Sequence, residues 1–323
     1  YIYMKQKNCL IWGASGQIGR NLIRKLTKDN FRVTAVTRNT HKNGYILKTQ
    51  ANPGFIDIVE ANIFDIEKIN QLTQEAQVVI NLIGILHQNN KLNSFENIHV
   101  KFPYILSKYC KQNNVEQLIH LSALGVEKAK DSDYAKSKLN GENAIKKNFE
   151  KTTILRPSVV FSVDDKFTTK FMTMLNLLPF FPLYYKGQTK FQPIFCSDLT
   201  NIISEIIKKK IFSETIECAG PEVLTFENII KELLKLINKK RFLISLPNFI
   251  GKYSSIFLEY FPRPIITLDQ FKILKYDNIL SHKYKNQKNF NLESTTYFVK
   301  EVEKYAHMWR DGGEFSKKFF KKI

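Results

Sequence analysis

The sequence has little of what a metal centre or a disulfide scaffold needs. Only four cysteines occur among its 323 residues, and none stands at metal-ligand spacing from a second cysteine or a histidine. This argues against a cysteine-based metal site and indicates unbridged thiols in a reducing compartment. Asp164, Asp165 and Asp198 also have no His or Glu at ligand spacing, so we expect no metal. We expect Asp198 to cap a helix that begins at Leu199.

Long apolar runs are missing too. No run reaches the roughly 18 residues that a membrane-spanning helix needs. The first residues lack the layout of a signal peptide, because a strand pattern begins almost at once, at Cys9. We therefore expect no transmembrane segment.

Acidic residues are outnumbered, 30 Asp and Glu against 49 Lys and Arg, which gives a net charge of +19. Such a balance favours anionic partners, namely nucleic acid, acidic lipid headgroups or an acidic protein surface. Compositional drift toward Lys, Asn and Ile would produce the same charge, and both explanations stay open. Nucleic acid is not expected as a partner, because no recognition motif accompanies the bulk charge.

What the first half does contain is a regular alternation of apolar runs and amphipathic stretches. The alternation predicts βαβ crossovers and a parallel sheet that is covered by helices on both faces. Helices are expected from about Asn21 and over Phe102–Gln112. The expected strands are Asn8–Trp12, Phe31–Thr37, Phe55–Val59, Gln77–Ile83 and Leu118–Ser122.

The pattern changes after about Lys151. A sixth strand is expected at Thr152–Leu155, then a proline-rich region with helices at Leu199–Lys209 and Phe226–Asn238. The fold class that we predict is α/β, a Rossmann-type doubly wound parallel sheet with a smaller C-terminal α/β lobe. The predicted divisions are a nucleotide-binding domain at 1–155, a smaller lobe interleaved with the sheet edge at 156–281, and a basic tail at 282–323.

The strongest motif is a glycine-rich loop between the first strand and the first helix. Gly13, Gly16 and Gly19 form the pattern GxxGxxG. Gly13 allows a tight turn, Gly16 lets the backbone approach a pyrophosphate, and Gly19 lets the helix pack close to the sheet. The helix N-terminus then faces the diphosphate. A strand before the loop and a helix after it supply the context that the motif requires, so it predicts a dinucleotide site.

The end of the second strand indicates which dinucleotide. NAD-binding folds place Asp or Glu there to bind the ribose 2′-hydroxyl, whereas this sequence has Thr37, Arg38 and Asn39. A guanidinium suits a 2′-phosphate. We therefore expect NADP(H) in preference to NAD(H), with Arg38 as the contact.

Further landmarks resemble the extended and atypical short-chain dehydrogenase/reductases. These are the glycine loop, Asn81–Gly84 after the fourth strand, the Tyr134-x-x-x-Lys138 pair, and Arg156–Pro157 after the sixth strand. Longer strings, His120–Glu142, Thr152–Phe167, Phe191–Ile203 and Glu217–Ile230, resemble the nucleotide-binding accessory subunits of respiratory complex I. That resemblance implies a tightly bound NADPH, complex I subunits as partners, and an assembly or stability role. It also implies a peripheral place on the cytoplasmic or matrix face of the inner membrane.

The resemblance also implies a set of site residues. Tyr134 and Lys138 lie on one face of a helix, where they could pass a proton during hydride transfer, or could serve only to hold the ribose and pack. The hydroxyl that orients substrate in such reductases falls at Leu124, so Ser122 would serve only if the loop differs. The candidate catalytic residues are Tyr134, Lys138 and Ser122. The candidate cofactor-binding residues are Gly13, Ser15, Gly16, Gln17, Ile18, Gly19, Arg38, Asn62, Ile63, Leu82, Ile83, Gly84, Ser122, Tyr134, Lys138 and Pro157.

Three functions stay open on this basis. The first is a complex I accessory subunit with a structural NADP(H). The second is an NADP-dependent reductase, epimerase or dehydratase, which Leu124 argues against. The third is an NmrA-like regulator that senses NADP without turnover.

Two segments invite a membrane or partner contact. Phe171–Tyr185 is unusually apolar, which suits either the core of the smaller lobe or a hydrophobic contact surface. The string Phe315–Lys322 mixes aromatic rings with cations, which suits an anionic membrane surface or a solvated tail.

Overall fold

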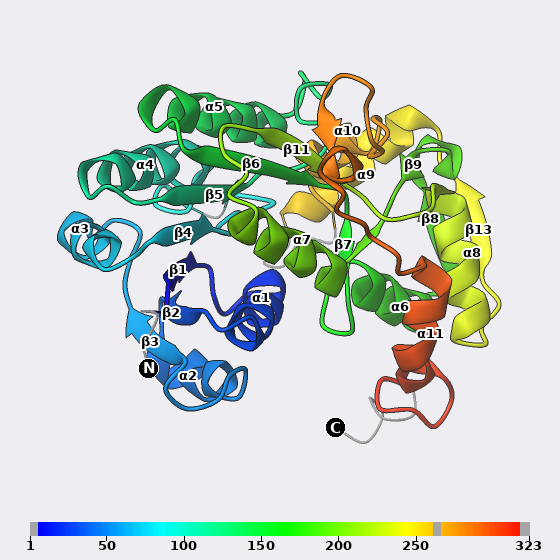
Figure 1. Cartoon of the computed structure of the whole chain (residues 1–323). Coiled ribbons are helices and arrows are strands. Elements are labelled where there is room, and N and C mark those ends of the chain that lie inside the picture. The colour runs from blue at the N-terminus through cyan, green and yellow to red at the C-terminus, as the bar shows by residue number, and fades with distance from the viewer. Residues whose placement is uncertain (1–5, 89, 261–265, 317–323) are drawn as a thin grey trace.

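A parallel sheet forms the centre of the computed structural model, which describes residues 6–88, 90–260 and 266–316 (Figure 1). Its strand order is β14-β11-β6-β5-β4-β1-β2-β3, and every neighbouring pair runs parallel. The strands are β1 Asn8–Trp12, β2 Arg32–Thr37, β3 Ile56–Glu60, β4 Val78–Asn81, β5 Gln117–Leu121, β6 Thr152–Pro157, β11 Thr215–Cys218 and β14 Lys285–Asn286. The strand order reverses between β1 and β4, the place where open α/β sheets bind ligands.

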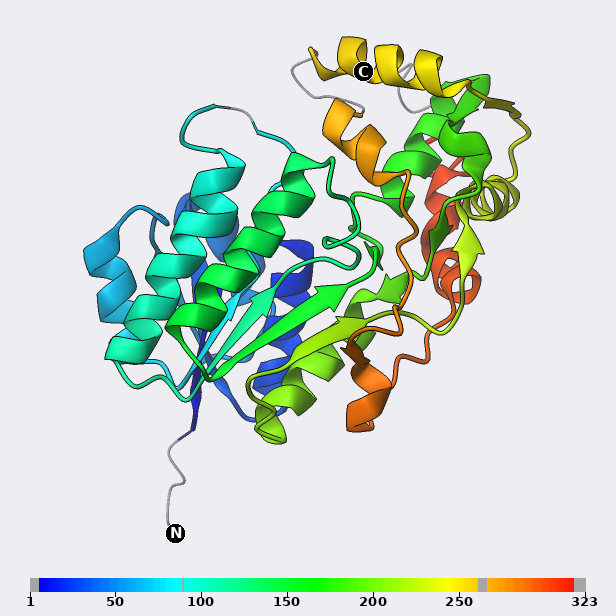
Figure 2. The same cartoon turned by 90° about the horizontal axis from the view of Figure 1, so that it is seen from above.

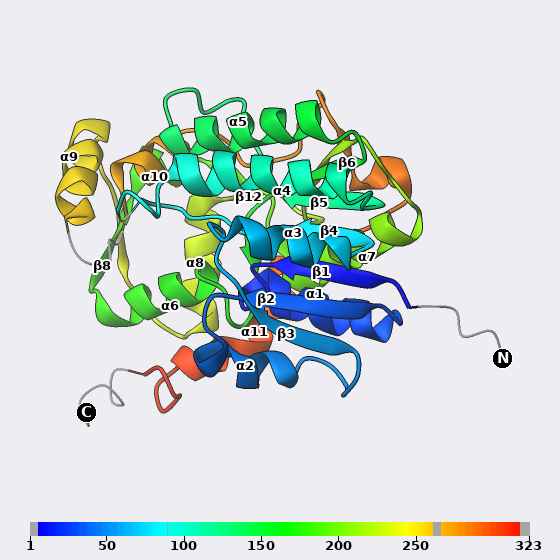
Figure 3. The same cartoon turned by 90° about the vertical axis from the view of Figure 1, so that its left-hand side faces the viewer.

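Helices cover both faces of the sheet (Figure 3). On one face lie α3 Ile66–Gln74, α4 Phe102–Gln112 and α5 Asp133–Asn148. On the other lie α1 Gln17–Lys28, α2 Thr40–Lys48 and α7 Cys196–Lys208. Each face has its own apolar core, which is why the central strands are apolar on both sides. The predicted fold class, a Rossmann-type doubly wound sheet, is confirmed.

A smaller part of the molecule lies beside the sheet edge (Figure 2), and it contains a third apolar cluster. Its elements come from the second half of the chain. They are α6 Thr168–Leu177, β8 Phe180–Leu183, α8 Phe226–Leu236, β13 Phe242–Ser245, α9 Asn248–Glu259, α10 Leu268–Ile273 and α11 Phe298–Ala306. Short elements connect this part to the sheet. The strands among them are β7 Val160–Phe161, β9 Lys190–Phe191, β10 Ile194–Phe195 and β12 Leu224–Thr225, and the single helical turns are η2 Tyr184–Gly187, η3 Gln287–Phe290 and η4 His307–Trp309.

The structure differs from the expectation of a basic tail from residue 282. β14 joins the main sheet beside β11. Helix α11 buries Phe298, Val302 and Tyr305 in the apolar cluster of the smaller part. These side chains recur at helical spacing, a signal that the surrounding lysines hide. Lys317–Lys322 of the predicted membrane-binding string lie outside the described residues.

Two further expectations can be compared with the structure. The prediction that Asp198 caps a helix beginning at Leu199 is wrong, because α7 begins at Cys196. Asp198 lies in its first turn, and its Oδ2 accepts from the backbone N–H groups of Thr295 and Thr296, each at 3.0 Å. Phe171–Tyr185 covers most of α6, all of β8 and the first half of η2. Its buried apolar side chains, Met172, Leu175, Phe181 and Leu183, belong to the core of the smaller part.

Within the described ranges, no helix is both long enough and apolar enough to cross a bilayer. In the same ranges, no three His, Cys, Asp or Glu side chains gather in a way that could hold a metal ion. All four cysteines are buried and unbridged.

A buried ion pair joins β6 to α5. The guanidinium of Arg156 donates to both carboxylate oxygens of Glu142, at 2.9 and 2.7 Å, and both side chains are almost fully buried. Its third nitrogen donates to Glu127 at 3.1 Å. The ring of Tyr284 covers the guanidinium at 4.3 Å. Burial by itself lowers the pKa of Arg156, but its hydrogen bonds and the nearby carboxylates outweigh burial and raise the pKa above its usual value. One side chain therefore links four separate segments.

We predict that Glu142→Ala lowers the free energy of unfolding by about 3–5 kcal/mol, because it leaves a buried guanidinium without its bidentate partner. Chemical denaturation of the purified chain measures this. The control is Asp133→Ala, which removes the exposed Lys136–Asp133 pair of the same helix and should cost less than about 1 kcal/mol. Equal losses of unfolding free energy in the two variants would show that the buried Arg156–Glu142 pair contributes no more than an exposed one.

Candidate functional site

The loop between β1 and α1 requires glycine at its first position. Gly13 has φ +86°, and a Cβ there would lie 3.2 Å from the carbonyl carbon of Leu82. The N–H of Gly16 donates to the carbonyl oxygen of Gly13 at 3.1 Å, which closes the turn. The loop therefore stands against the end of β4, at the reversal of the sheet.

Gly16 and Gly19 differ in what surrounds them. A Cβ on Gly19 would lie 2.5 Å from the carbonyl oxygens of both Gly13 and Ala14, so only glycine allows this approach of helix and loop. A Cβ on Gly16 would meet only the Gly13 oxygen, at 3.3 Å. Gly16 is also the N-cap of α1 and supplies no side-chain cap. The helix N-terminus is thus open in the way that an anion-binding N-terminus is.

A second segment covers the side of this loop. The side-chain nitrogen of Gln17 donates to Ser162 Oγ at 2.9 Å, and the Ser162 hydroxyl in turn donates to the carboxylate of Asp164 at 2.6 Å. Arg20 forms an ion pair with Asp164 and donates to the carbonyl oxygen of Ser15 at 2.6 Å. The hydroxyl of Ser162 therefore fixes the neighbouring loop.

The end of β2 carries an exposed cation and a neighbouring acid. Arg38 follows β2 directly and is exposed. Glu60 of β3 pairs in register with Thr37, and its carboxylate accepts from the backbone N–H and the hydroxyl of Thr40, each at 2.7 Å. These two hydrogen bonds lower the pKa of Glu60. Reasoning along the sequence missed Glu60 because it reaches this position from the next strand.

The predicted adenine contacts follow β3. Ile63 is buried in the apolar core. Asn62 is exposed, and its side-chain oxygen accepts from the backbone N–H of Phe64 at 3.2 Å. That oxygen therefore already has a partner in its own turn.

The segment after β4 approaches α5 closely. The N–H of Leu82 donates to the carbonyl oxygen of Trp12 at 3.0 Å, and that of Ile83 to the side-chain oxygen of Asn81 at 3.0 Å. A Cβ on Gly84 would lie 3.1 Å from Lys138 Nζ. The absence of a side chain at 84 therefore leaves room for that ammonium.

Tyr134 and Lys138 lie one turn apart on α5, as predicted from their spacing. Lys138 is buried, and its Nζ donates to the carbonyl oxygen of Leu121 at 3.1 Å. Burial lowers the pKa of Lys138 to about 8. Burial and the nearby carboxylate of Asp269 raise the pKa of Tyr134 to about 12. Ser122 Oγ is buried at the end of β5 and has no hydrogen-bond partner within the described part of the chain.

Asp269 of α10 caps α5 from outside. Its carboxylate accepts from the Ser132 hydroxyl at 2.8 Å and from the backbone N–H groups of Asp133 and Tyr134 at 2.8 and 3.0 Å. A carboxylate at a helix N-terminus is stabilised by the free N–H groups and the helix dipole. The smaller part of the molecule therefore positions the helix that carries Tyr134.

Two buried imidazoles stand beside Lys138. His99 Nε2 accepts from the N–H of Ile85 at 3.1 Å, and its Nδ1 lies 2.8 Å from Ser137 Oγ. Burial, with the ammonium of Lys138 adding, lowers the pKa of His99 to about 2. His120 Nδ1 lies 3.1 Å from the side-chain nitrogen of Asn81, and burial places its pKa well below the usual value. His99 therefore joins the segment after β4 to α5, and His120 joins β5 to β4.

Leu124, where the resemblance implies a substrate-orienting hydroxyl, is buried. Its N–H donates to the carbonyl oxygen of Pro157 at 2.9 Å, and its carbonyl accepts from Asn278 at 3.0 Å. Asn278 also accepts from Ser158 Oγ at 2.6 Å. The backbone at 124 is thus fixed from two sides and presents an apolar side chain.

The structure brings most of the predicted residues to one edge of the sheet. The glycine loop, residues 82–84, Ser122, Lys138 and the buried Pro157 gather at or beside the carboxyl ends of β1, β4, β5 and β6. Arg38, Asn62 and Ile63 follow β2 and β3, farther along that edge.

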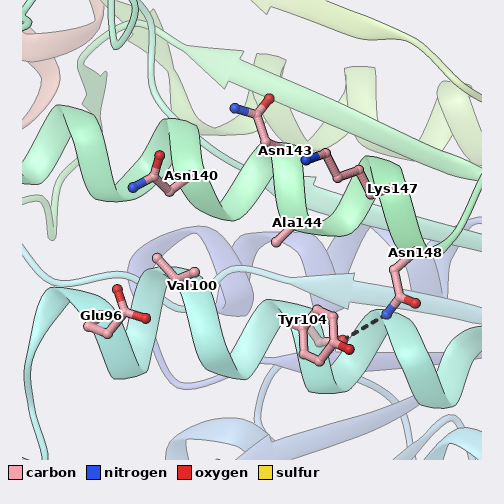
Figure 4. A pocket seen from close by; sticks show the side chains of 8 residues that line it. All are labelled: Glu96, Val100, Tyr104, Asn140, Asn143, Ala144, Lys147 and Asn148. Atoms are coloured by element: carbon pink, nitrogen blue, oxygen red, sulfur yellow. Dashed lines mark hydrogen bonds between the residues drawn. The ribbon is translucent and has the colours of Figure 1, made fainter.

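A groove of about 610 Å³ lies elsewhere, along the outer side of α4 and α5 (Figure 4). Neither Tyr134 nor Lys138 lines it. Its lining residues are Glu96, Val100, Tyr104, Asn140, Asn143, Ala144, Lys147 and Asn148. Their side chains are mostly polar, and the groove is separate from the candidate site.

Comparisons with known proteins agree with this geometry. A family model described as NAD(P)H-binding matches residues 13–180, more than half of the chain. The chain is 28% identical to NADH dehydrogenase (ubiquinone) 1 alpha subcomplex subunit 9 of Dictyostelium discoideum, over 95% of this chain and 86% of that protein. It is 24% identical to the NADH-ubiquinone oxidoreductase 40 kDa subunit of Neurospora crassa, over 88% and 74%. These relatives are mitochondrial subunits of one respiratory enzyme, as the resemblance in the sequence implied.

Solved structures share the fold over nearly the whole chain. A dTDP-glucose 4,6-dehydratase from Bacillus anthracis in complex with NAD has a TM-score of 0.71 at 15% identity, covering 97% of this chain and 99% of that one. A UDP-glucuronic acid 4-epimerase from Bacillus cereus has a TM-score of 0.68 at 21% identity, covering 93% and 98%. At these identities the likeness shows the architecture alone.

We predict that substitutions at Gly16 and Gly19 separate ligand binding from folding. Gly19→Ala should lower the free energy of unfolding by about 1–3 kcal/mol even without nucleotide, because its methyl group collides with two carbonyl oxygens. Gly16→Val should leave the ligand-free melting temperature near that of wild type and abolish dinucleotide binding. Thermal melts with and without nucleotide test both. Nucleotide affinity unchanged in Gly16→Val would show that this loop does not hold the diphosphate.

Proposed function

Because this chain belongs to the NAD(P)H-binding family, we propose that it is an NADP(H)-binding accessory subunit of respiratory complex I in which the dinucleotide is mainly structural. The observation that carries the structural role is the buried Leu124 at the position of the substrate-orienting hydroxyl. The subunit assignment rests on the relatives, whose similarity extends over most of the chain and well past the nucleotide loop. By analogy with them, it would lie peripherally on the matrix or cytoplasmic face of the inner membrane.

The cofactor site is proposed from groups that suit a dinucleotide. The open N-terminus of α1 would face the diphosphate, and the loop at Gly13 and Gly16 would approach it. Lys138 stands at the next strand end, where the nicotinamide half would lie. So does the hydroxyl of Ser122, which has no hydrogen-bond partner among the residues that the structure describes. A bound dinucleotide supplies hydride chemistry only if a substrate is also oriented and protonated.

NADP(H) is favoured over NAD(H) by the environment of Arg38. An exposed guanidinium at the end of β2 suits a 2′-phosphate. Glu60 is the acid nearest in register, but its carboxylate is engaged by Thr40 at the start of α2. This engagement leaves Arg38 as the charged group directly following β2.

The acid–base groups are poorly suited to turnover. A general acid works best when its pKa lies near the operating pH, whereas burial raises the pKa of Tyr134 to about 12. The side chain of Leu124 cannot donate a hydrogen bond to a substrate oxygen. A tightly bound ligand would still stabilise the folded chain, because it binds the native state and not the unfolded one.

A reductase remains the second candidate because Tyr134 and Lys138 keep their spacing and Ser122 Oγ has no partner in the described structure. Only turnover of a soluble carbonyl or alcohol separates this candidate from the first. The third, a regulator that senses NADP, gains no support from any described contact.

We predict that the purified chain binds NADP(H) more tightly than NAD(H), and that Arg38→Ala weakens NADP(H) binding by about tenfold to a hundredfold, as loss of a charged hydrogen bond should. Titration with both nucleotides measures this. Arg32→Ala, at the other end of the same strand, is the matched control and should leave both affinities unchanged. Tighter binding of NAD(H) would refute the preference.

We also predict that Tyr134→Phe leaves respiratory NADH oxidation nearly intact, whereas Gly16→Val depletes the assembled complex, because the first removes a proton donor and the second removes a stabilising ligand. Native gels and NADH oxidation by membranes from cells that express each variant measure both. Rapid NADPH turnover on a soluble substrate, lost in Tyr134→Phe, would instead support the reductase.

A further inference from the structure

Helix α9 packs by its small residues and leaves its aromatic residues outside. Its buried residues are Gly251 and Ser255. A Cβ on Gly251 would lie 2.7 Å from the ring of Phe271 on α10 and 3.1 Å from the ring of Tyr184. Glycine at 251 therefore lets α9 lie directly against those two rings. This is the reverse of an ordinary surface helix, which buries its apolar stripe.

The opposite side of α9 carries Phe249 and Tyr253, and its C-cap is Tyr260. We call these three residues the aromatic face of α9. Their exposed fractions are 65%, 68% and 86%. At 100° per residue these three positions fall within about 40° of one another, opposite Gly251 and Ser255. The helix lies at the edge of the smaller part, far from β1 and α3 (Figures 2 and 3).

The strand that precedes α9 continues this exposure. On β13, Phe242 is 80% and Ile244 is 44% exposed, and Phe180, the register partner of Phe242 on β8, is 50% exposed. The alternate β8 residues, Phe181 and Leu183, face the core. A large apolar area on the outside of a water-soluble domain indicates an interaction surface.

The charge around this surface suits an anionic occupant. Residues 239–260 contain four cations and one acid, Glu259. Of the cations, Lys239 forms an ion pair with Asp311, and Arg241 donates to the carbonyl oxygens of Leu175 and Asn176. The carboxylate of Glu259 accepts from the backbone N–H of Leu268 at 3.0 Å, so it is directed toward α10. Lys240 and Lys252 are exposed. Lys252 lies beside the aromatic face, within one turn of Phe249.

We infer that the aromatic face of α9 lies on an anionic lipid surface. A helix of 12 residues is too short to span a bilayer but can lie in its interface. Tyrosine prefers the headgroup level, because its ring is apolar and its hydroxyl is polar, while flanking lysines reach the phosphates. A second copy of this chain is disfavoured as occupant, since each copy carries a net charge of +19. The inference does not depend on nucleotide binding.

The test is sedimentation of the full chain with vesicles of phosphatidylcholine and phosphatidylserine in equal parts, and with phosphatidylcholine alone. We expect binding to the mixed vesicles that weakens with salt. The double variant Phe249→Ser/Tyr253→Ser should bind about tenfold more weakly or worse. The matched control is Tyr45→Ser/Leu92→Ser, which removes two side chains that are 79% and 63% exposed elsewhere and should bind as wild type does.

Three results would overturn the inference. One is equal vesicle binding by wild type and the α9 variant. Another is a wild-type dimer on size exclusion that the α9 variant abolishes, which would make a second copy the occupant. The third is a wild type that binds no vesicles while the α9 variant is lost from assembled complex I, which would make a protein the occupant. NADP(H) titration of the α9 variant should match wild type, so failure here is distinguishable from failure of the proposed cofactor site.

Discussion

The buried guanidinium of Arg156 is the contact that joins four segments around the main sheet. It lies on β6, pairs with Glu142 of α5, reaches Glu127 in the loop after β5, and lies under the ring of Tyr284. A buried charge is tolerated only when partners satisfy it, so the folded state needs all of these segments in place. That constraint fixes the position of α5 along the strands of the sheet.

The candidate site follows from the position of α5. Glu142 fixes the helix in its middle, and Asp269 of α10 fixes its first turn. Between these anchors Lys138 points to the end of β5, where Gly84 leaves room for it. The imidazoles of His99 and His120 are buried near Lys138. Each forms a hydrogen bond without adding a charge, His99 with Ile85 and His120 with Asn81.

The structural role that we propose for the dinucleotide rests on an arrangement that offers more groups for holding it than for using it. The glycine loop and the open end of α1 suit a diphosphate, but Leu124 offers no hydroxyl and Tyr134 resists ionisation. A site that keeps binding groups and loses its substrate-orienting group retains the part that contributes to stability. The helix α9, anchored through α10, lies in the part of the molecule that also supplies Asp269, so a surface contact there would act on a structure already coupled to α5.

The sequence by itself determined the local parts of this protein. Strand and helix periods depend on near neighbours, so β1, β6 and α4 were predicted within two residues, and GxxGxxG identified its turn because each glycine has a steric role. Only the tertiary structure decided what depends on distant residues. It brought Glu60 beside the end of β2, turned the basic segment after residue 282 into β14 and α11, and moved the start of α7 to Cys196. It also turned the aromatic side of α9 outward. The exposed face of a helix is determined by which elements pack against its opposite face. No spacing along the chain records that Gly251 meets Phe271.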